Sequence, residues 1–136
     1  MIKVNLDELF SEAQKAACLA YAPYSKFRVG AALLSEDGTI ITGCNVENRS
    51  FGLTICAERS AVVKAISLGH RSFTALAVST PDSAIPVGPC GACRQVLSEF
   101  MLPESPVLFG GSGKEKVETT LGILCPFDSL HDLGRR

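Results

Sequence analysis

Three cysteines and one glutamate stand in two short motifs whose residue types suit metal chemistry. The first motif is Cys56-Ala57-Glu58, and the second is the segment PCGAC at positions 89–93. Each follows a loop-like stretch and opens a helical pattern. A helix N-terminus favours thiolates, because its free N–H groups and its dipole stabilise negative charge. Two such helices packed side by side would aim three sulfurs at one point, and three thiolates at tetrahedral spacing suit zinc.

The number of ligands separates a catalytic zinc site from a structural one. Three protein ligands, here Cys56, Cys90 and Cys93, leave a fourth position for water. Glu58 lies two residues after Cys56, and this offset places a carboxylate beside the metal without binding it. A carboxylate in that place can move protons. The pattern therefore favours a catalytic zinc site.

Two other interpretations of these cysteines remain open. Cys90 and Cys93 alone fit a redox-active pair, although such a pair needs no third cysteine beside a glutamate. A closed zinc site, in a structural module that binds another protein, would need a fourth protein ligand. The candidates are Cys18, Cys44, His70, Cys125 and His131. None of them stands in a second Cys-x-x-Cys or His-x-x-x-His spacing, and the first two cysteines fit buried small apolar residues.

Composition narrows the class of protein. The 136 residues carry 13 Lys and Arg against 14 Asp and Glu, so the basic excess of a nucleic-acid-binding protein is missing. No run approaches the roughly 18 apolar residues of a membrane span. The first residues have no apolar stretch behind a basic start, so we expect a cytoplasmic protein with reduced thiols, six cysteines being too few for a disulfide scaffold. We expect no nucleic-acid or membrane partner.

The elements that must position these motifs fit one domain over residues 1–136. Apolar periodicity predicts helices over residues 6–20, 56–68 and 94–100. Apolar runs predict strands over 29–35, 40–45, 74–79, 106–110 and 116–119, with loops at 47–54 and 81–89 and a short helix and arm in the tail at 120–133. Asp37-Gly38 marks a hairpin between the first two strands. Helices alternating with strands after a hairpin predict a three-layer α/β fold with a mixed five-stranded sheet between helices.

The two motifs and three further segments resemble the cytidine deaminase family in its small homotetrameric form. Residues 21–27 and 29–34 resemble the family's first hairpin, and residues 43–48 resemble its ribose-holding stretch. Residues 56–59 and 89–96 are similar to its zinc motifs. The likeness covers nearly the whole chain. It implies the cytidine-deaminase-like fold and hydrolytic deamination of cytidine and deoxycytidine to uridine and deoxyuridine plus ammonia, a step of pyrimidine salvage.

The resemblance also implies roles for individual residues. Cys56, Cys90 and Cys93 become the ligands of one Zn²⁺ per chain, and Glu58 becomes the catalytic proton shuttle. Arg59, next to Glu58, is expected to donate to a ligand sulfur and so to offset the charge of three thiolates. The alternative interpretation of Arg59 is that it forms a surface ion pair.

Further positions fall on the family's substrate contacts. Asn45 and Glu47 match contacts to the ribose hydroxyls, Phe27 flanks the base, and Ala57 offers a backbone contact to the reacting end. Phe127 resembles a C-terminal phenylalanine that enters the site of a neighbouring subunit. Phe51 stands where tyrosine is common, so it keeps the ring and loses the hydroxyl. Their plain alternatives are loop polar residues and core aromatic residues.

Two expectations concern substrate and assembly. A carboxylate such as Glu47 beside the sugar accepts hydroxyl hydrogen bonds and repels phosphate, which favours a nucleoside over a nucleotide or a strand. An antibiotic nucleoside that carries cytosine is a close alternative substrate. The mean hydropathy of +0.24 indicates apolar surface hidden between copies of the chain, in line with the homotetramer that the resemblance implies.

Overall fold

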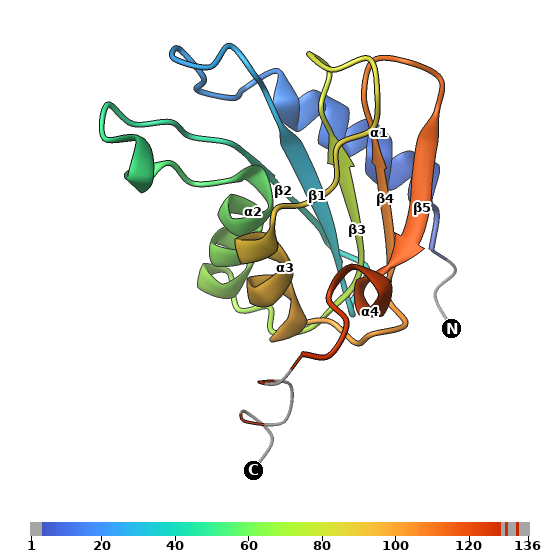
Figure 1. Cartoon of the computed structure of the whole chain (residues 1–136). Coiled ribbons are helices and arrows are strands. Elements are labelled where there is room, and N and C mark those ends of the chain that lie inside the picture. Colours follow the sequence, from blue (N-terminus) through green and yellow to red (C-terminus); the bar gives the residue numbers. More distant parts are fainter. Residues whose placement is uncertain (1–3, 129, 131–132, 134–136) are drawn as a thin grey trace.

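The computed structural model describes residues 4–128, 130 and 133. It places a five-stranded sheet between helices on both of its faces, which confirms the predicted fold class (Figure 1). The strands are β1 (Gly30–Ser35), β2 (Ile40–Cys44), β3 (Phe73–Ser79), β4 (Pro106–Gly110) and β5 (Lys116–Thr120). The described helices are α1 (Leu6–Ala17), α2 (Ala57–Ser67), α3 (Gly91–Ser98) and α4 (Leu121–Leu124), with a single 3-10 turn η1 (Phe51–Leu53).

The sheet is mixed, in the order β2-β1-β3-β4-β5. Strand β1 pairs antiparallel with β2 and with β3, and β4 pairs antiparallel with β5. Strands β3 and β4 are parallel, so the chain between them must cross over, and α3 lies in that crossover. This connection brings the start of α3 to the same face of the sheet as α2 (Figure 1).

Each face of the sheet has its own apolar core. Helix α1 covers one face, where Leu9, Phe10 and Ala13 pack on alanines and leucines of β1, β3 and β4. The opposite face carries the larger core, to which α2 contributes Ala57, Ala61, Val62 and Ala65 and α3 contributes Leu97. The first residue of α2 thus belongs to the core, so packing holds the metal motif in place.

Two glycines allow the helices to approach the sheet closely. A Cβ atom at Gly30 would lie 2.0 Å from the carbonyl oxygen of Ala13 in α1. A Cβ atom at Gly43 would lie 2.4 Å from the backbone nitrogen of Ala61 in α2. Because backbone atoms cannot yield as a flexible side chain can, both positions require glycine.

The ends of the elements differ from the predicted ones by a few residues. Helix α1 ends at Ala17 and continues to Ala20 as a tighter turn, in which the N–H groups of Leu19 and Ala20 bond carbonyls three residues back. Helix α3 starts at Gly91, three residues before the predicted start. The predicted loop at 47–54 contains η1, and the tail helix is the single turn α4.

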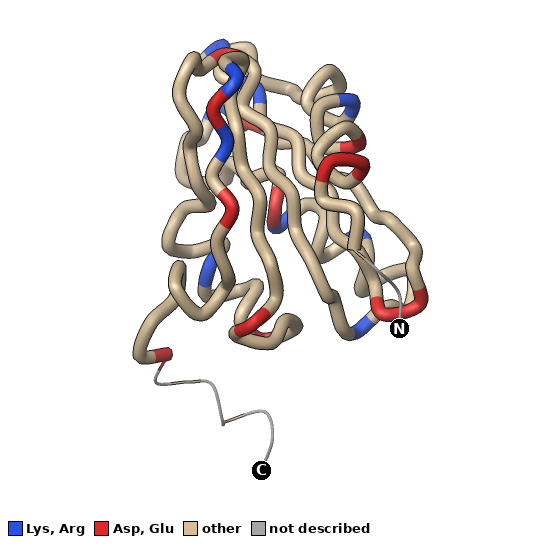
Figure 2. The backbone as a smooth tube through the Cα atoms, turned by 90° about the vertical axis from the view of Figure 1, so that its right-hand side faces the viewer, with Lys and Arg blue, Asp and Glu red and all other residues tan. Residues whose placement is uncertain are grey.

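Charged residues of both signs are interspersed along the chain rather than gathered on one element (Figure 2). No helix among the described residues is long and apolar enough to span a membrane.

Candidate active site

The starts of α2 and α3 bring three cysteine sulfurs together. Cys56 is the N-cap residue of α2, Cys90 is the N-cap residue of α3, and Cys93 lies in the first turn of α3. Their Sγ atoms all lie within 4.8 Å of one another, and Cys56 Sγ lies 3.8 Å from Cys90 Sγ. Sulfurs that bind zinc tetrahedrally at about 2.3 Å are about 3.8 Å apart, so the three thiols fit this metal.

No fourth protein ligand joins this cluster among the residues that the structure describes. Cys18 is exposed, so the prediction that it is buried is wrong. The residue follows the end of α1, and its thiol donates to the carbonyl of Gln14. Cys44 is half-buried. The Nδ1 atom of His70 lies 3.0 Å from Ser35 Oγ, at the other end of β1 from the cluster. His131, another candidate, lies outside the described residues.

Arg59 points its guanidinium at the sulfur cluster. Its Nη2 atom lies 3.3 Å from Cys56 Sγ. Hydrogen bonds from Cys93, Arg59 and Cys90 lower the pKa of the Cys56 thiol to about 5, and the Cys93 contact is the largest of these effects. The same contact with Cys56, together with burial, raises the pKa of Cys93. The cluster therefore already favours a thiolate at Cys56, the form that binds zinc.

Glu58 lies in the first turn of α2 and is 4% exposed. Burial, aided by the nearby Cys56 thiolate, raises the pKa of its carboxyl group to about 7, while Arg59 acts in the opposite direction. A carboxyl group that titrates near neutral pH can both accept and release a proton under working conditions. Its position and its acidity therefore suit a general acid and base.

A cavity of about 160 Å³ opens beside the cluster. Its walls are mostly apolar with a few polar side chains among them, an arrangement typical of a small-molecule site. It is lined by Phe27, Val29, Asn45, Thr54, Cys56, Ala57, Glu58, Val78, Thr80, Val87, Gly88 and Cys90. The structure thus brings the sequence-predicted Phe27, Asn45 and Ala57 to the same cavity as Glu58.

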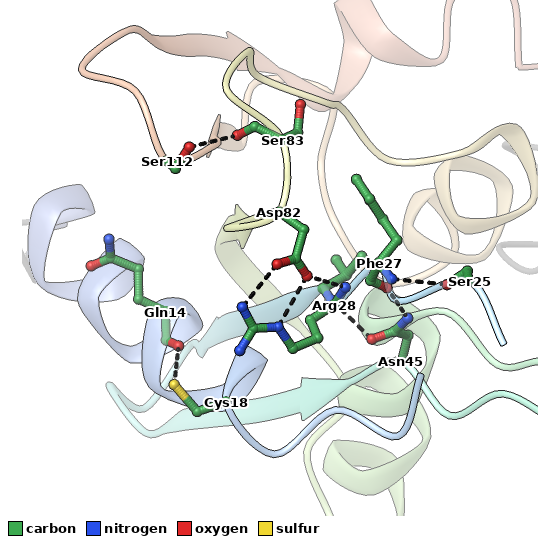
Figure 3. Close-up of polar contacts among 10 residues, drawn as sticks. Gln14, Cys18, Ser25, Phe27, Arg28, Asn45, Asp82, Ser83 and Ser112 are labelled. Atoms are coloured by element: carbon green, nitrogen blue, oxygen red, sulfur yellow. Dashed lines mark hydrogen bonds and ion pairs between the residues drawn. The ribbon is translucent and has the colours of Figure 1, made fainter. Parts of the chain in front are cut away.

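Asn45 fixes the segment that carries Phe27. Its Oδ1 atom accepts a hydrogen bond from Val29 N at 2.9 Å, and its Nδ2 atom donates to the carbonyl oxygen of Phe27 at 2.8 Å. Both bonds reach across from the end of β2 (Figure 3). A carboxamide has two N–H groups and two acceptor lone pairs, so one of each is left after these bonds for a substrate hydroxyl.

Glu47 does not line the cavity. Its carboxylate accepts hydrogen bonds from Tyr24 N at 3.0 Å, from Ser25 N at 3.1 Å and from the Ser25 hydroxyl. The Ser25 hydroxyl bond is the main reason that the pKa of Glu47 is lowered, so the group is ionised at neutral pH. Because Ser25 Oγ also accepts from Phe27 N at 3.0 Å, Glu47 shapes the loop in front of the cavity.

The other two aromatic candidates also lie away from the cavity of their own chain. Phe51 is 72% exposed, and its ring meets that of Tyr24 edge-on, with 5.6 Å between the ring centres. Phe127 is fully exposed, and its backbone has a φ of 53°. Neither ring lies in the core, so the alternative interpretation of Phe51 and Phe127 as core aromatic residues is wrong.

No pattern in the sequence predicts the part of the cavity wall that lies between β3 and α3. Thr80, Val87 and Gly88 line the cavity, although the segment at 81–89 was expected to be only a proline-broken loop. The sequence nevertheless indicates this role, because residues 81–89 lead directly into the second cysteine motif. The segment therefore has to end beside the metal ligands.

Comparisons with known proteins agree with this geometry. Residues 3–108 match the family model described as the cytidine and deoxycytidylate deaminase zinc-binding region. The chain is 52% identical to a cytidine deaminase of Sporosarcina psychrophila over 123 residues, 90% of each chain. It is 49% identical to a cytidine deaminase of Halalkalibacterium halodurans over 118 residues, 87% of this chain and 89% of the relative. A crystal structure of cytidine deaminase from Burkholderia pseudomallei superposes with a TM-score of 0.86 at 43% identity, covering 91% of this chain and 98% of that one.

Proposed function

The chain belongs to the cytidine and deoxycytidylate deaminase family, and we propose that its single domain deaminates cytidine and deoxycytidine by hydrolysis. The products are uridine or deoxyuridine and ammonia. Zinc is the cofactor of this enzyme family. One observation carries the assignment: the buried Glu58 lines one small cavity together with Cys56 and Cys90, two members of the three-cysteine cluster. The products would enter pyrimidine salvage.

Cys56, Cys90 and Cys93 would hold one Zn²⁺ per chain. When bound, zinc lowers the pKa of a water molecule and thereby supplies a nucleophile near neutral pH. Three thiolates would give the site a net charge of −1, which weakens that effect. The guanidinium of Arg59, 3.3 Å from Cys56 Sγ, and the N-termini of α2 and α3 withdraw part of this charge.

Glu58 moves the protons of the reaction. It accepts a proton from the attacking water and delivers it to N3 of the pyrimidine ring, which makes C4 more electrophilic. After attack at C4, Glu58 takes up the remaining proton of the added hydroxyl and delivers it to the departing amine, so that ammonia leaves and the 4-oxo product remains. The pKa of about 7 supports this double role, since both protonation states are accessible.

The walls of the cavity orient the nucleoside. Phe27 and Val29 offer apolar surface to the face of the base, and the backbone of Ala57 meets the reacting end of the ring. The free hydrogen-bonding capacity of Asn45 serves a ribose hydroxyl. The ionised Glu47, which holds the adjacent loop, adds a ribose contact and a negative charge that disfavours a 5′-phosphate.

We propose that the chain assembles as a cytoplasmic homotetramer and needs neither nucleic acid nor a membrane. A band of exposed apolar side chains supports assembly; it includes Tyr21, Val46, Phe51, Leu53 and Ile55. The fully exposed Phe127 supports the exchange of a ring between subunits. In the tetramer Phe51 and Phe127 would contact the substrate of a neighbouring chain.

Ultraviolet absorbance of the purified protein with candidate substrates tests this function. We expect turnover of cytidine and deoxycytidine, little turnover of dCMP, and none of adenosine. The matched control is Glu58→Gln, which should keep one zinc per chain and lose turnover. A wild-type protein that binds zinc without deaminating either nucleoside would instead favour a structural zinc module, and efficient turnover of dCMP would contradict the role of Glu47. A cytosine-bearing antibiotic nucleoside belongs in the same panel.

A further inference from the structure

Arg28 and Asp82 tie together two segments that both contribute to the walls of the cavity, residues 27–29 and residues 80–88. Arg28 Nη2 donates to Asp82 Oδ1 at 2.8 Å, and Arg28 Nε donates to Asp82 Oδ2 at 3.0 Å. The backbone N–H of Arg28 donates to the same Oδ2 atom at 2.8 Å. One carboxylate therefore holds both the side chain and the backbone of Arg28 across 54 positions of sequence (Figure 3).

Arg28 sits between two residues that line the cavity. Phe27 and Val29 face the cavity, and Arg28, which alternates with them, faces away toward Asp82. Asn45 holds the same segment from the other side through Phe27 O and Val29 N. Just before it, Lys26 has a φ of 60°, a conformation that needs outside support in a residue other than glycine. The wall thus depends on contacts from both of its sides.

Asp82 belongs to a firmly anchored segment. Thr80 N donates to Gly110 O at 3.0 Å, and Ser112 N donates to Ser83 O at 2.7 Å, so β4 and the turn after it hold the residues on both sides of Asp82. A Cβ atom at Gly111 would lie 2.1 Å from Ser83 O, which shows how closely the turn packs here. Asp82 is therefore the fixed partner to which the Phe27 segment is tied.

The pair is placed to define geometry rather than to stabilise the fold. The side chains of Arg28 and Asp82 are 45% and 27% exposed, and ion pairs of this exposure contribute little to global stability. A two-point Arg–carboxylate contact nevertheless fixes distance and orientation. Its loss should leave the chain folded and change the spacing of the two walls.

We propose that Arg28 and Asp82 form a positioning pair that sets the spacing between the Phe27–Val29 wall and the Val87–Gly88 wall around the base. Neither residue touches the reacting atoms. This inference rests on the proposed deaminase function. Since these walls would contact the ring away from the reacting atoms, we expect the pair to contribute to uniform binding, which appears in KM and not in kcat.

The test compares Arg28→Gln, Asp82→Asn and the double variant with wild type. The readouts are kcat and KM for cytidine, the inhibition constant of the product uridine, zinc content and Tm. We expect KM and the uridine constant to rise about 3- to 10-fold in each single variant, with kcat within about twofold and zinc unchanged. The effects of the two changes should be clearly less than additive in the double variant, because either change alone removes the two-point side-chain contact and leaves at most the bond from the Arg28 backbone N–H.

Two further variants sharpen the test. Arg28→Lys keeps the charge and loses the two-point contact, so it should behave like Arg28→Gln. Lys15→Gln breaks the exposed ion pair with Glu12 on α1 and should match wild type. An unchanged KM and uridine constant in the Arg28 and Asp82 variants, fully additive effects, or an Arg28→Lys variant equal to wild type would overturn the proposal. A wild-type protein without cytidine turnover would instead overturn the proposed function.

Discussion

The guanidinium of Arg59 lies 3.3 Å from the sulfur of Cys56, one turn earlier at the start of the same helix. This contact raises the pKa of Arg59 further above its already high value, so the charge is permanent. The Nε atom of Arg59 is buried and makes no hydrogen bond among the described residues. Arg59 therefore contacts the cluster through the terminal Nη2 group of its guanidinium and through its charge. This placement suits a residue that offsets thiolate charge.

Arg59→Gln should keep zinc and lose activity. Without the guanidinium, the thiolates retain more charge, so the metal acidifies water less. Changes to residues that contact metal ligands typically cost 10- to 100-fold in affinity or activity, so we expect kcat to fall roughly within this range. Metal analysis and steady-state kinetics on the same sample check this. An Arg59→Gln enzyme with wild-type kcat would show that the contact is only structural.

Glu58→Ala should retain the fold and the zinc and lose turnover by several orders of magnitude. General acid and base catalysis contributes roughly 10²–10⁴-fold, and here one residue serves more than one transfer. Circular dichroism, zinc content and kcat are the measurements. Residual activity within about tenfold of wild type would refute the proton-shuttle role.

Gly43→Ala should disturb the metal site indirectly, by pushing α2 away from β2 of the sheet. The added Cβ would lie 2.4 Å from Ala61 N and 2.8 Å from Ala57 O, both backbone atoms of α2, whose N-cap residue is Cys56. Overpacking of this kind costs roughly 1–3 kcal/mol. We expect a lower Tm together with weaker zinc retention against a chelator. The control is Gly52→Ala, where the added Cβ meets nothing within 4 Å, and equal chelator resistance in both variants would contradict the coupling.

Acid should weaken the Arg28–Asp82 contact in a defined pH window. Arg28 lowers the pKa of Asp82 to about 2, below its value of about 4 in an unfolded chain. A depressed carboxyl pKa stabilises the fold above the unfolded value, here only slightly because both side chains are partly exposed, and this small stabilisation is lost as pH falls from about 4 toward 2. In urea unfolding, the difference between wild type and Asp82→Asn should be constant above about pH 5 and shrink below pH 4. A difference that does not change with pH would show that the charge contributes nothing.

The sequence predicted the metal end of the site better than its substrate end, for a physical reason. Cys56, Cys90 and Cys93 are N-cap or first-turn residues, so local helix signals fix where they point once α2 and α3 lie on one face. The Arg28–Asp82 contact joins loops 54 positions apart, and no local pattern encodes it. The ribose contact expected of Glu47 stays a prediction, and its bonds to Tyr24 and Ser25 depend on a loop conformation that spacing does not show.

Phe127→Ala tests whether each site borrows a ring from a neighbouring subunit. Phe127 is fully exposed in its own chain, so its removal should cost no packing within that chain. Stacking of a base on an aromatic ring contributes roughly 1–3 kcal/mol, so KM for cytidine should rise between about 5- and 150-fold with zinc retained. Ile123→Ala, a nearby exposed apolar residue, is the control for a general loss of apolar surface. Dilution that dissociates the assembly should lower the specific activity to the same extent. Sedimentation measures the dissociation. A fully active monomer, or a Phe127→Ala enzyme with wild-type KM, would show that each chain completes its own site.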